Sequence, residues 1–253
     1  MNNAERSRMA VLNLLERQFT VRNYETDFRQ NLKPSAILGY FQETAGDHSE
    51  EMGLGFAKLA ESGYFWVLSK MYVEIKALPK FRDTVTVSTW PHEPNKAIYE
   101  RSFEMRSDSN DVLLRAFSRW CILSVKNGRI VPCSQIEQPQ IDFIDHKSVD
   151  FSEWRIDALR EKERPAFSLK IANSEYDLNN HVNNIKYADY MMNCFSVEEL
   201  RMKNIRSFQI HYIKQSHEGD VLDFYKEERD GEYYIEGIKN GSESVIAARV
   251  RFA

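Results

Sequence analysis

Alternating apolar and polar positions divide the chain into two series of expected strands. In the first half, runs rich in β-branched and aromatic residues lie at 65–75, 84–90, 98–105 and 113–123. In the second half, similar runs lie at 208–213, 221–226, 233–238 and 244–252. The dipeptides Asp230-Gly231 and Asn240-Gly241 separate the last three runs and favour tight hairpins. The pattern therefore predicts two antiparallel meanders.

One helix is expected before each series of strands. The first begins near Pro34, because proline suits a first helical turn, and helical spacing is kept by Ile37, Leu38, Phe41 and Ala45. The second follows Asn184, and apolar residues cover much of its circumference: Ile185, Ala188, Met191, Met192 and Phe195. Such a helix should be largely buried, so each helix is expected to pack against one face of its sheet.

A third helix is expected at the N-terminus. Met9, Leu12, Leu15 and Phe19 recur at roughly helical spacing and indicate an amphipathic helix packed on the domain. A mobile lid over an apolar tunnel is the alternative role for this segment. The apolar run lacks a small-residue cleavage site and is too short to span a bilayer, so no stable membrane insertion is expected.

The sequences of the two halves are similar, and this similarity predicts a duplication. The residues that match in similar contexts are Asp83 with Asp220, Ala116 with Ala247, and Tyr24-Glu25 with Tyr176-Asp177. We predict domains at 1–133 and 164–253, joined by a charged linker at 134–163. The expected fold class is α+β, with each antiparallel sheet wrapped around a buried helix. Pairing of the two sheets by their edge strands would remove two exposed edges and place both helices on one side.

Charge and cysteine content exclude several classes of protein. The chain has 34 basic and 38 acidic residues, a net charge of -4, which gives no global field for binding nucleic acid. Its three cysteines, Cys121, Cys133 and Cys194, are odd in number and have no CxxC spacing, which weighs against a disulfide framework or structural zinc. No nucleotide-binding or GxSxG motif occurs, so we expect no cofactor, no metal and a cytoplasmic protein.

A dense polar cluster precedes the second helix. Asp177, Asn179 and His181 alternate along the chain, and an extended backbone would place all three side chains on the same side. They supply a carboxylate, an amide and an imidazole, which suits deprotonation of a water and stabilisation of an oxyanion. Asn183 and Asn184, which follow, are better explained as helix caps.

The run from Asp177 to Tyr187 resembles the catalytic motif of the plant and bacterial acyl-acyl carrier protein thioesterases. Similarity to the N-terminal domain of that family extends over Glu43-Thr44-Ala45, Trp66 to Met71, Asp83 to Trp90 and Arg115 to Trp120. The resemblance implies a tandem double hotdog fold and hydrolysis of fatty acyl thioesters on acyl carrier protein without a metal. It also implies that the C-terminal half is catalytic and the N-terminal half binds the acyl chain. The long transit peptide of the plant members is missing here, which favours a bacterial form.

The resemblance implies a fourth polar site residue, usually glutamate, at the position of Gln215. Glutamine cannot act as a base, so Gln215 is expected to orient water or substrate. The base is then Asp177 or His181, between which the sequence does not choose, and Asn179 is an amide donor. A cysteine once considered as the nucleophile of the family corresponds to Ser216, which weighs against a covalent cysteine mechanism.

Several further residues are candidates for substrate binding. Phe41 and Trp66 are candidate lining for an acyl tunnel, although such aromatics more often only fill a core. Arg201, Lys203 and Arg206 form the most basic short stretch of this region and are a candidate docking patch for acidic acyl carrier protein, against a general surface role. The alternative functions are an acyl-coenzyme A thioesterase on the same fold and a non-catalytic acyl-binding hotdog protein. A homodimer is a working guess for the quaternary state.

Overall fold

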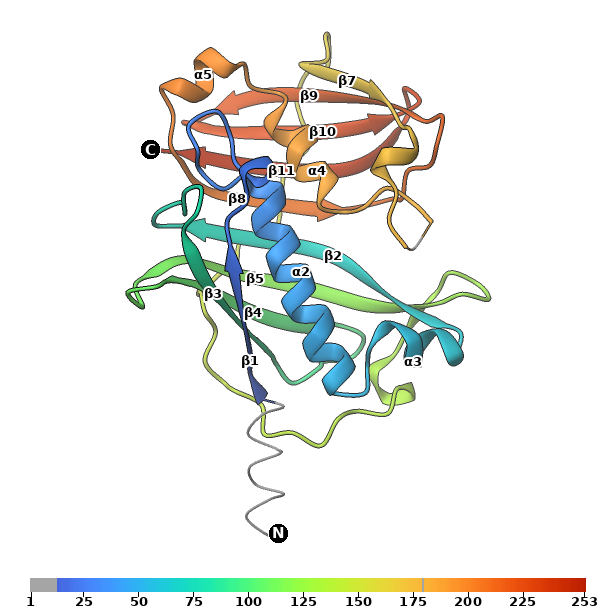
Figure 1. Ribbon diagram of the computed structural model, residues 1–253. Coiled ribbons are helices and arrows are strands. Elements are labelled where there is room, and N and C mark those ends of the chain that lie inside the picture. The colour runs from blue at the N-terminus through green and yellow to red at the C-terminus, as the bar shows by residue number, and fades with distance from the viewer. Residues whose placement is uncertain (1–12, 179) are drawn as a thin grey trace.

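One antiparallel sheet runs through both halves of the molecule (Figure 1). The computed structural model describes residues 13–178 and 180–253. The eleven strands of this sheet follow the order β1-β3-β4-β5-β2-β8-β11-β10-β9-β7, with the short β6 paired to β5. The α+β class expected from the sequence is confirmed. No helix within the described ranges is long and apolar enough to cross a membrane.

Within the described residues, the N-terminal half carries the first six strands and two α-helices. The strands are β1 (Leu15–Thr20), β2 (Tyr64–Ile75), β3 (Thr84–Pro91), β4 (Tyr99–Ser107), β5 (Val112–Ser124) and β6 (Ile130–Val131). The helices are α2 (Pro34–Glu51) and α3 (Phe56–Glu61), with short 3-10 turns η1 (Asn23–Glu25) and η2 (Cys133–Gln135). The four strands predicted in this half and the helix beginning at Pro34 are confirmed.

The C-terminal half repeats this order in shorter form. The strands are β7 (Phe167–Lys170), β8 (Ile205–Tyr212), β9 (Val221–Arg229), β10 (Glu232–Lys239) and β11 (Glu243–Phe252). The helices are α4 (Lys186–Met192) and α5 (Val197–Arg201), with the 3-10 turn η3 (Asn173–Glu175). All four strands predicted here are confirmed. β7, like β1 in the other half, lies ahead of the helix and was not predicted.

The N-terminal segment expected to be a helix contains strand β1. Leu15 pairs with Thr89 and Thr20 with Thr84, in antiparallel register with β3. Side-chain exposure alternates along the strand, and Phe19 stacks on Tyr40 of α2 with ring centroids 4.3 Å apart. The helix prediction is wrong here, because Leu15 and Phe19 also share one side of a strand, and pairing with β3 decides between the two structures. Met9 and Leu12 lie outside the described residues, and the lid role stays untested.

The two halves are joined by the pairing of β2 with β8. The register runs from Lys70 opposite His211 to Glu74 opposite Ser207. Because each strand also has a partner in its own half, this pairing leaves neither as an exposed edge. The expected edge-to-edge joining of two sheets is therefore confirmed.

Both buried helices lie on the same face of the long sheet. Figure 1 shows α2 and α4 on one side, and the two helices contact each other. Phe41 of α2 stacks on Phe103 of β4 with centroids 4.8 Å apart. A single apolar core continues from these residues to Met191 and Phe224 in the other half. Burial against the sheet, rather than helix propensity, stabilises the seven-residue α4.

The opposite face of the sheet is covered by the segment between the two halves, residues 136–166, which contains no helix or strand. Ser102 points away from α2, because Phe103 beside it faces the helix and successive side chains alternate. The backbone N–H of Ser148 donates to Ser102 Oγ at 3.1 Å, and Trp154 packs against Phe117 on that face.

Two short loops with the same geometry support a duplicated origin. Tyr40 donates to Glu25 and Tyr190 to Glu175, each at 2.6 Å. Burial and the adjacent carboxylate raise the pKa of both tyrosines. Glu25 therefore corresponds to Glu175, and the sequence match of Tyr24-Glu25 with Tyr176-Asp177 is wrong by two residues.

His211 makes the fold sensitive to acid. It accepts a hydrogen bond from Gln209 Nε2 at 2.9 Å, and burial together with Lys70 and Arg249 lowers its pKa to about 4. In the unfolded chain, His211 takes up a proton near pH 6.5, the usual histidine value. In the folded chain it remains neutral until the pH falls to about 4. Stability from this group is therefore complete above about pH 6.5 and is lost progressively as the pH falls toward 4.

We predict that His211→Gln flattens the decline in unfolding free energy between pH 7 and pH 4. Urea unfolding at a series of pH values measures this decline. His217→Gln is the matched control, because it makes the same substitution at an exposed position. Equal profiles for the wild type and His211→Gln would contradict the prediction.

Candidate active site

A cavity of about 770 Å³ lies between helix α2, helix α3, the sheet and the loop that precedes α4. Helix α2 lines it with one stripe of residues, spaced at helical intervals: Gln42, Ala45, Gly46 and Ser49. The C-terminal half lines it with the loop around Asp177 and with the end of β8. Both halves of the molecule therefore contribute to one cavity.

The loop before α4 is a tight turn rather than the extended segment expected from the sequence. Tyr176 and Val182 form an isolated bridge, and the Asp177 N–H donates to the His181 carbonyl at 3.1 Å. Asn180 turns the chain with a φ of 61°, a left-handed conformation that asparagine tolerates. Asp177 and His181 lie opposite each other at the neck of the loop and both line the cavity. Asn179 lies outside the described residues.

The imidazole of His181 has a defined tautomer. Its Nδ1 is 2.9 Å from the carbonyl oxygen of Val182. A carbonyl can only accept, so Nδ1 carries the hydrogen and donates. Nε2 is left with a lone pair and can accept a proton from a molecule bound in the cavity.

The segment after β8 contributes Gln215 to the same cavity as Asp177 and His181. Gln215 is exposed, and its backbone carbonyl accepts from Lys239 Nζ at 3.2 Å. Ser216 beside it is buried and is bonded to the Tyr187 hydroxyl at 2.9 Å. Gln215 therefore faces solvent at the cavity rim while Ser216 anchors the segment.

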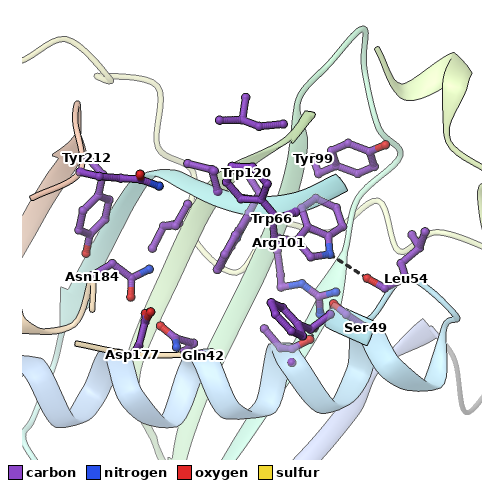
Figure 2. A pocket seen from close by; sticks show the side chains of 18 of the residues that line it. Gln42, Ser49, Leu54, Trp66, Tyr99, Arg101, Trp120, Asp177, Asn184 and Tyr212 are labelled. Atoms are coloured by element: carbon purple, nitrogen blue, oxygen red, sulfur yellow. Dashed lines mark hydrogen bonds between the residues drawn. The ribbon is translucent and has the colours of Figure 1, made fainter. Parts of the chain in front are cut away.

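The sequence did not indicate three polar residues at this end of the cavity. Figure 2 shows Gln42, Asn184 and Tyr212 around Asp177. They belong to α2, to the loop before α4 and to β8, respectively. The buried Asn184 Oδ1 and the Tyr212 hydroxyl have no hydrogen-bond partner in the described part of the chain. Burial raises the pKa of Tyr212, so its hydroxyl remains a neutral donor. Only the cap-like position of Asn184 gave a signal, and it indicated the wrong role.

The neighbouring Asn183 makes a side-chain hydrogen bond just ahead of α4. Its side-chain Oδ1 accepts from the Ile185 N–H at 3.1 Å. Asn184 instead directs its amide toward the cavity (Figure 2). The N-cap residue of α4 is Ile185, without a side-chain cap, so neither asparagine is the cap. The structural role expected of Asn183 holds, because it bonds the N–H of that residue.

The middle of the cavity is apolar. It is lined by Leu68 and by the rings of Trp66, Trp120 and Tyr99. Trp66 donates its Nε1–H to the Leu54 carbonyl at 2.8 Å, which fixes the ring in place (Figure 2).

Phe41, the other aromatic candidate from the sequence, is not part of the cavity lining. Its side chain is fully buried in the core against Phe103. Phe41 lies on the α2 face that packs on the sheet, whereas the lining stripe lies on an adjacent face.

The basic patch expected near the site lies away from the cavity. Arg201, Lys203 and Arg206 precede or begin β8, whereas Ile213, just past its end, lines the cavity. The seven residue steps from Arg206 to Ile213 span about 23 Å in an extended strand. Lys203 is also engaged, because its ammonium bonds the Tyr233 hydroxyl and lies over that ring. The basic stretch is close to the site in sequence but not in space, because it lies at the opposite end of β8 from the residues that line the cavity.

Comparison with protein families matches both halves of the chain. Residues 13–136 match the acyl-ACP thioesterase N-terminal domain, and residues 157–249 match the acyl-ACP thioesterase C-terminal domain. A chloroplastic acyl-[acyl-carrier-protein] hydrolase of Cuphea viscosissima is 26% identical over 217 residues, covering 81% of this chain and 52% of that protein. The chain thus spans about half the length of the first curated relatives it matches.

Solved structures show the same architecture. An acyl-ACP thioesterase from Bacteroides thetaiotaomicron has a TM-score of 0.88, 26% sequence identity and coverage of 100% of both chains. The 12:0-ACP thioesterase from Umbellularia californica has a TM-score of 0.81 and 21% identity, covering 95% of this chain and 97% of that one. The double hotdog fold expected from the sequence is confirmed.

We predict that Tyr212→Phe stabilises the protein by about 1 kcal/mol, because it removes a buried hydroxyl that lacks a partner. Tyr187→Phe is the matched control, and it should destabilise by about 1 kcal/mol because it breaks the bond to Ser216. Urea unfolding at neutral pH measures both changes. A loss of stability in Tyr212→Phe as large as that in Tyr187→Phe would contradict the assignment.

Proposed function

The chain belongs to the acyl-ACP thioesterase family, and from this premise we propose that it hydrolyses fatty acyl thioesters of acyl carrier protein. The products are a free fatty acid and the carrier with its free thiol. One observation carries the proposal: Asp177 and His181 face a cavity that is polar at this end and apolar beyond it. Such a cavity suits a thioester carbonyl at the polar end and an alkyl chain in the apolar part.

His181 is the proposed general base. Its Nε2 has a free lone pair, because Nδ1 donates to the Val182 carbonyl. A water held between His181 and Asp177 would lose its proton to Nε2 as its oxygen attacks the thioester carbon. Asp177 orients this water and stabilises the imidazolium that forms. The leaving thiol ionises near pH 8.5, so its departure needs little help from an acid.

Neutral donors are proposed to stabilise the oxyanion. The Tyr212 hydroxyl and the Asn184 amide lie at the same end of the cavity as Asp177 (Figure 2). A preorganised donor of this kind typically contributes about 10² to 10³ in rate. Asn179, by its place in the motif, is proposed as a further amide donor, and Gln215 as a group that orients water or substrate at the rim.

We predict that His181→Ala lowers kcat by about 10² to 10⁴, the range for loss of a general base. His146→Ala is the matched control, because His146 is exposed and is not part of the cavity lining. Thiol release from acyl-acyl carrier protein, followed with a thiol reagent, measures both. A near-normal kcat in His181→Ala together with an inactive Asp177→Asn would transfer the base role to Asp177.

The carrier is proposed to dock at the cavity mouth rather than at Arg201, Lys203 and Arg206. Gly128, in the turn between β5 and β6, lines the cavity, and the flanking Lys126 and Arg129 are exposed. Neither of these two side chains forms an ion pair within the described residues. Acyl carrier protein is acidic, so free cations beside the mouth suit its approach.

We predict that Lys126→Glu combined with Arg129→Glu raises KM for acyl-acyl carrier protein several-fold and spares acyl-pantetheine. Arg201→Glu combined with Arg206→Glu is the matched control, because it reverses equal charge at the far end of β8. Steady-state kinetics on both substrates measures the effect. A larger rise in the control would restore the docking patch expected from the sequence, and higher kcat/KM for acyl-coenzyme A than for any carrier substrate would favour the alternative substrate class.

A reducing cytoplasm is the proposed location. Cys121, Cys133 and Cys194 are all free thiols, and burial raises the pKa of Cys121 and of Cys194, the latter to about 12. Thiols held protonated in this way are poor nucleophiles, which also supports hydrolysis by water rather than by a cysteine.

A further inference from the structure

A buried cation lies in the half of the cavity remote from Asp177. Arg101, on β4, is only 6% exposed and lines the cavity. Figure 2 shows its guanidinium within the cavity, beside Ser49 of α2 and below the ring of Trp66. An apolar acyl tunnel has no need of this group.

The partners of Arg101 are neutral. Its Nη1 donates to His48 Nδ1 at 3.0 Å and is 3.3 Å from Thr89 Oγ1. Because His48 Nδ1 accepts this bond, that nitrogen carries no hydrogen. Within the described ranges Arg101 forms no ion pair, and its Nε and Nη2 have no hydrogen-bond acceptor.

The two carboxylates that line this region are committed elsewhere. Glu100 pairs with Arg119 and Lys147, and Glu50 accepts from the Phe56 N–H at 2.8 Å. Arg101 is therefore a buried cation whose remaining donors face the cavity.

Leaving these donors against an alkyl chain would be unfavourable. Burial lowers the pKa of Arg101 to about 9, so the group is still charged at neutral pH. The free-energy cost of desolvating a cation without hydrogen bonds is far larger than the free energy gained from one apolar contact. A ligand that fills this part of the cavity must therefore bring an acceptor or leave water in place.

Another polar side chain lies in the same region. Ser49 lies beside Arg101 and lines the cavity, in contrast to the apolar Leu68 and Trp120 (Figure 2). The cavity is thus polar beside Asp177 and again beside Arg101, and apolar between them. This pattern matches a chain with an oxygen at each end.

The spacing along α2 gives the length of such a chain. Gln42 lies beside Asp177 and Ser49 beside Arg101 (Figure 2). Ser49 is seven residue steps from Gln42 along the α-helix, which corresponds to a rise of about 10 Å. The distal acceptor is therefore expected on a chain of medium length.

We propose that Arg101 selects acyl chains that carry a hydrogen-bond-accepting oxygen, a hydroxyl or a carboxylate, at the end remote from the thioester. This inference rests on the proposed thioesterase function. Arg101 acts as a specificity residue, since it binds the distal group and takes no part in bond cleavage.

The test compares three series of carrier-linked substrates at octanoyl, decanoyl and dodecanoyl length, ending in a methyl, a hydroxyl or a carboxyl group. The wild type should show the highest kcat/KM for an oxygen-terminated chain. Arg101→Met, which keeps side-chain length but removes the donors, should lower kcat/KM for that chain by about tenfold to a hundredfold and spare the methyl-terminated chain. Arg115→Met, on the neighbouring strand and exposed, is the matched control and should change neither.

A preference of the wild type for methyl-terminated chains at every length would overturn the inference, whether or not Arg101→Met folds. A preference for carboxyl over hydroxyl chains, or the reverse, identifies the acceptor.

A binding assay separates this inference from the proposed function. Decanoic, 10-hydroxydecanoic and decanedioic acids are tested for their shift of the thermal unfolding midpoint. If no thioester is cleaved but the oxygen-terminated acids stabilise the wild type more than Arg101→Met, the hydrolase function fails and the ligand preference stands. Equal stabilisation by all three acids would reject the preference.

Discussion

The pairing of β2 with β8 is the interaction on which the rest of the structure depends. It converts two short sheets, each with an open edge, into one continuous sheet, and it places both buried helices on the same face. Only in this arrangement does α2 of the first half lie over the Asp177 loop of the second. The cavity is formed by both halves, so neither half alone contains it.

Duplication with divergence explains the different use of the two matching loops. Asp27 and Asp177 occupy the same place, since each N–H donates to a carbonyl four residues later and a residue with positive φ follows in each loop. In the first half, Asp27 accepts from two backbone N–H groups of its own turn, those of Arg29 and Asn31. In the second half, the aspartate lines the cavity opposite His181. The same turn geometry thus places an aspartate in the cavity wall in the second half but not in the first.

The polarity of the cavity is unusual because several of its buried groups have no partner or only neutral partners in the protein. Among the described residues, Asn184 Oδ1 and the Tyr212 hydroxyl have no hydrogen-bond partner at one end, and Arg101 has only neutral partners at the other. Each of these groups reduces the stability of the empty protein. Binding of a ligand with suitably placed polar atoms would recover that free energy, which is how such a site gains specificity. The apolar rings between them contribute affinity without discrimination.

The sequence by itself determined the strands, the two principal helices and the cluster of Asp177, Asn179 and His181, because hydrophobic periodicity and motif spacing are local properties. It did not distinguish β1 from a helix, since apolar residues four positions apart, Leu15 and Phe19, fit both periods until the strand partner is known. Tertiary structure alone decided that Phe41 is core, that Arg206 lies far from the cavity and that Asn184, Tyr212 and Arg101 face it. Those outcomes depend on which faces and strand ends meet across the β2–β8 junction, and contacts between residues so distant in the chain leave no local pattern.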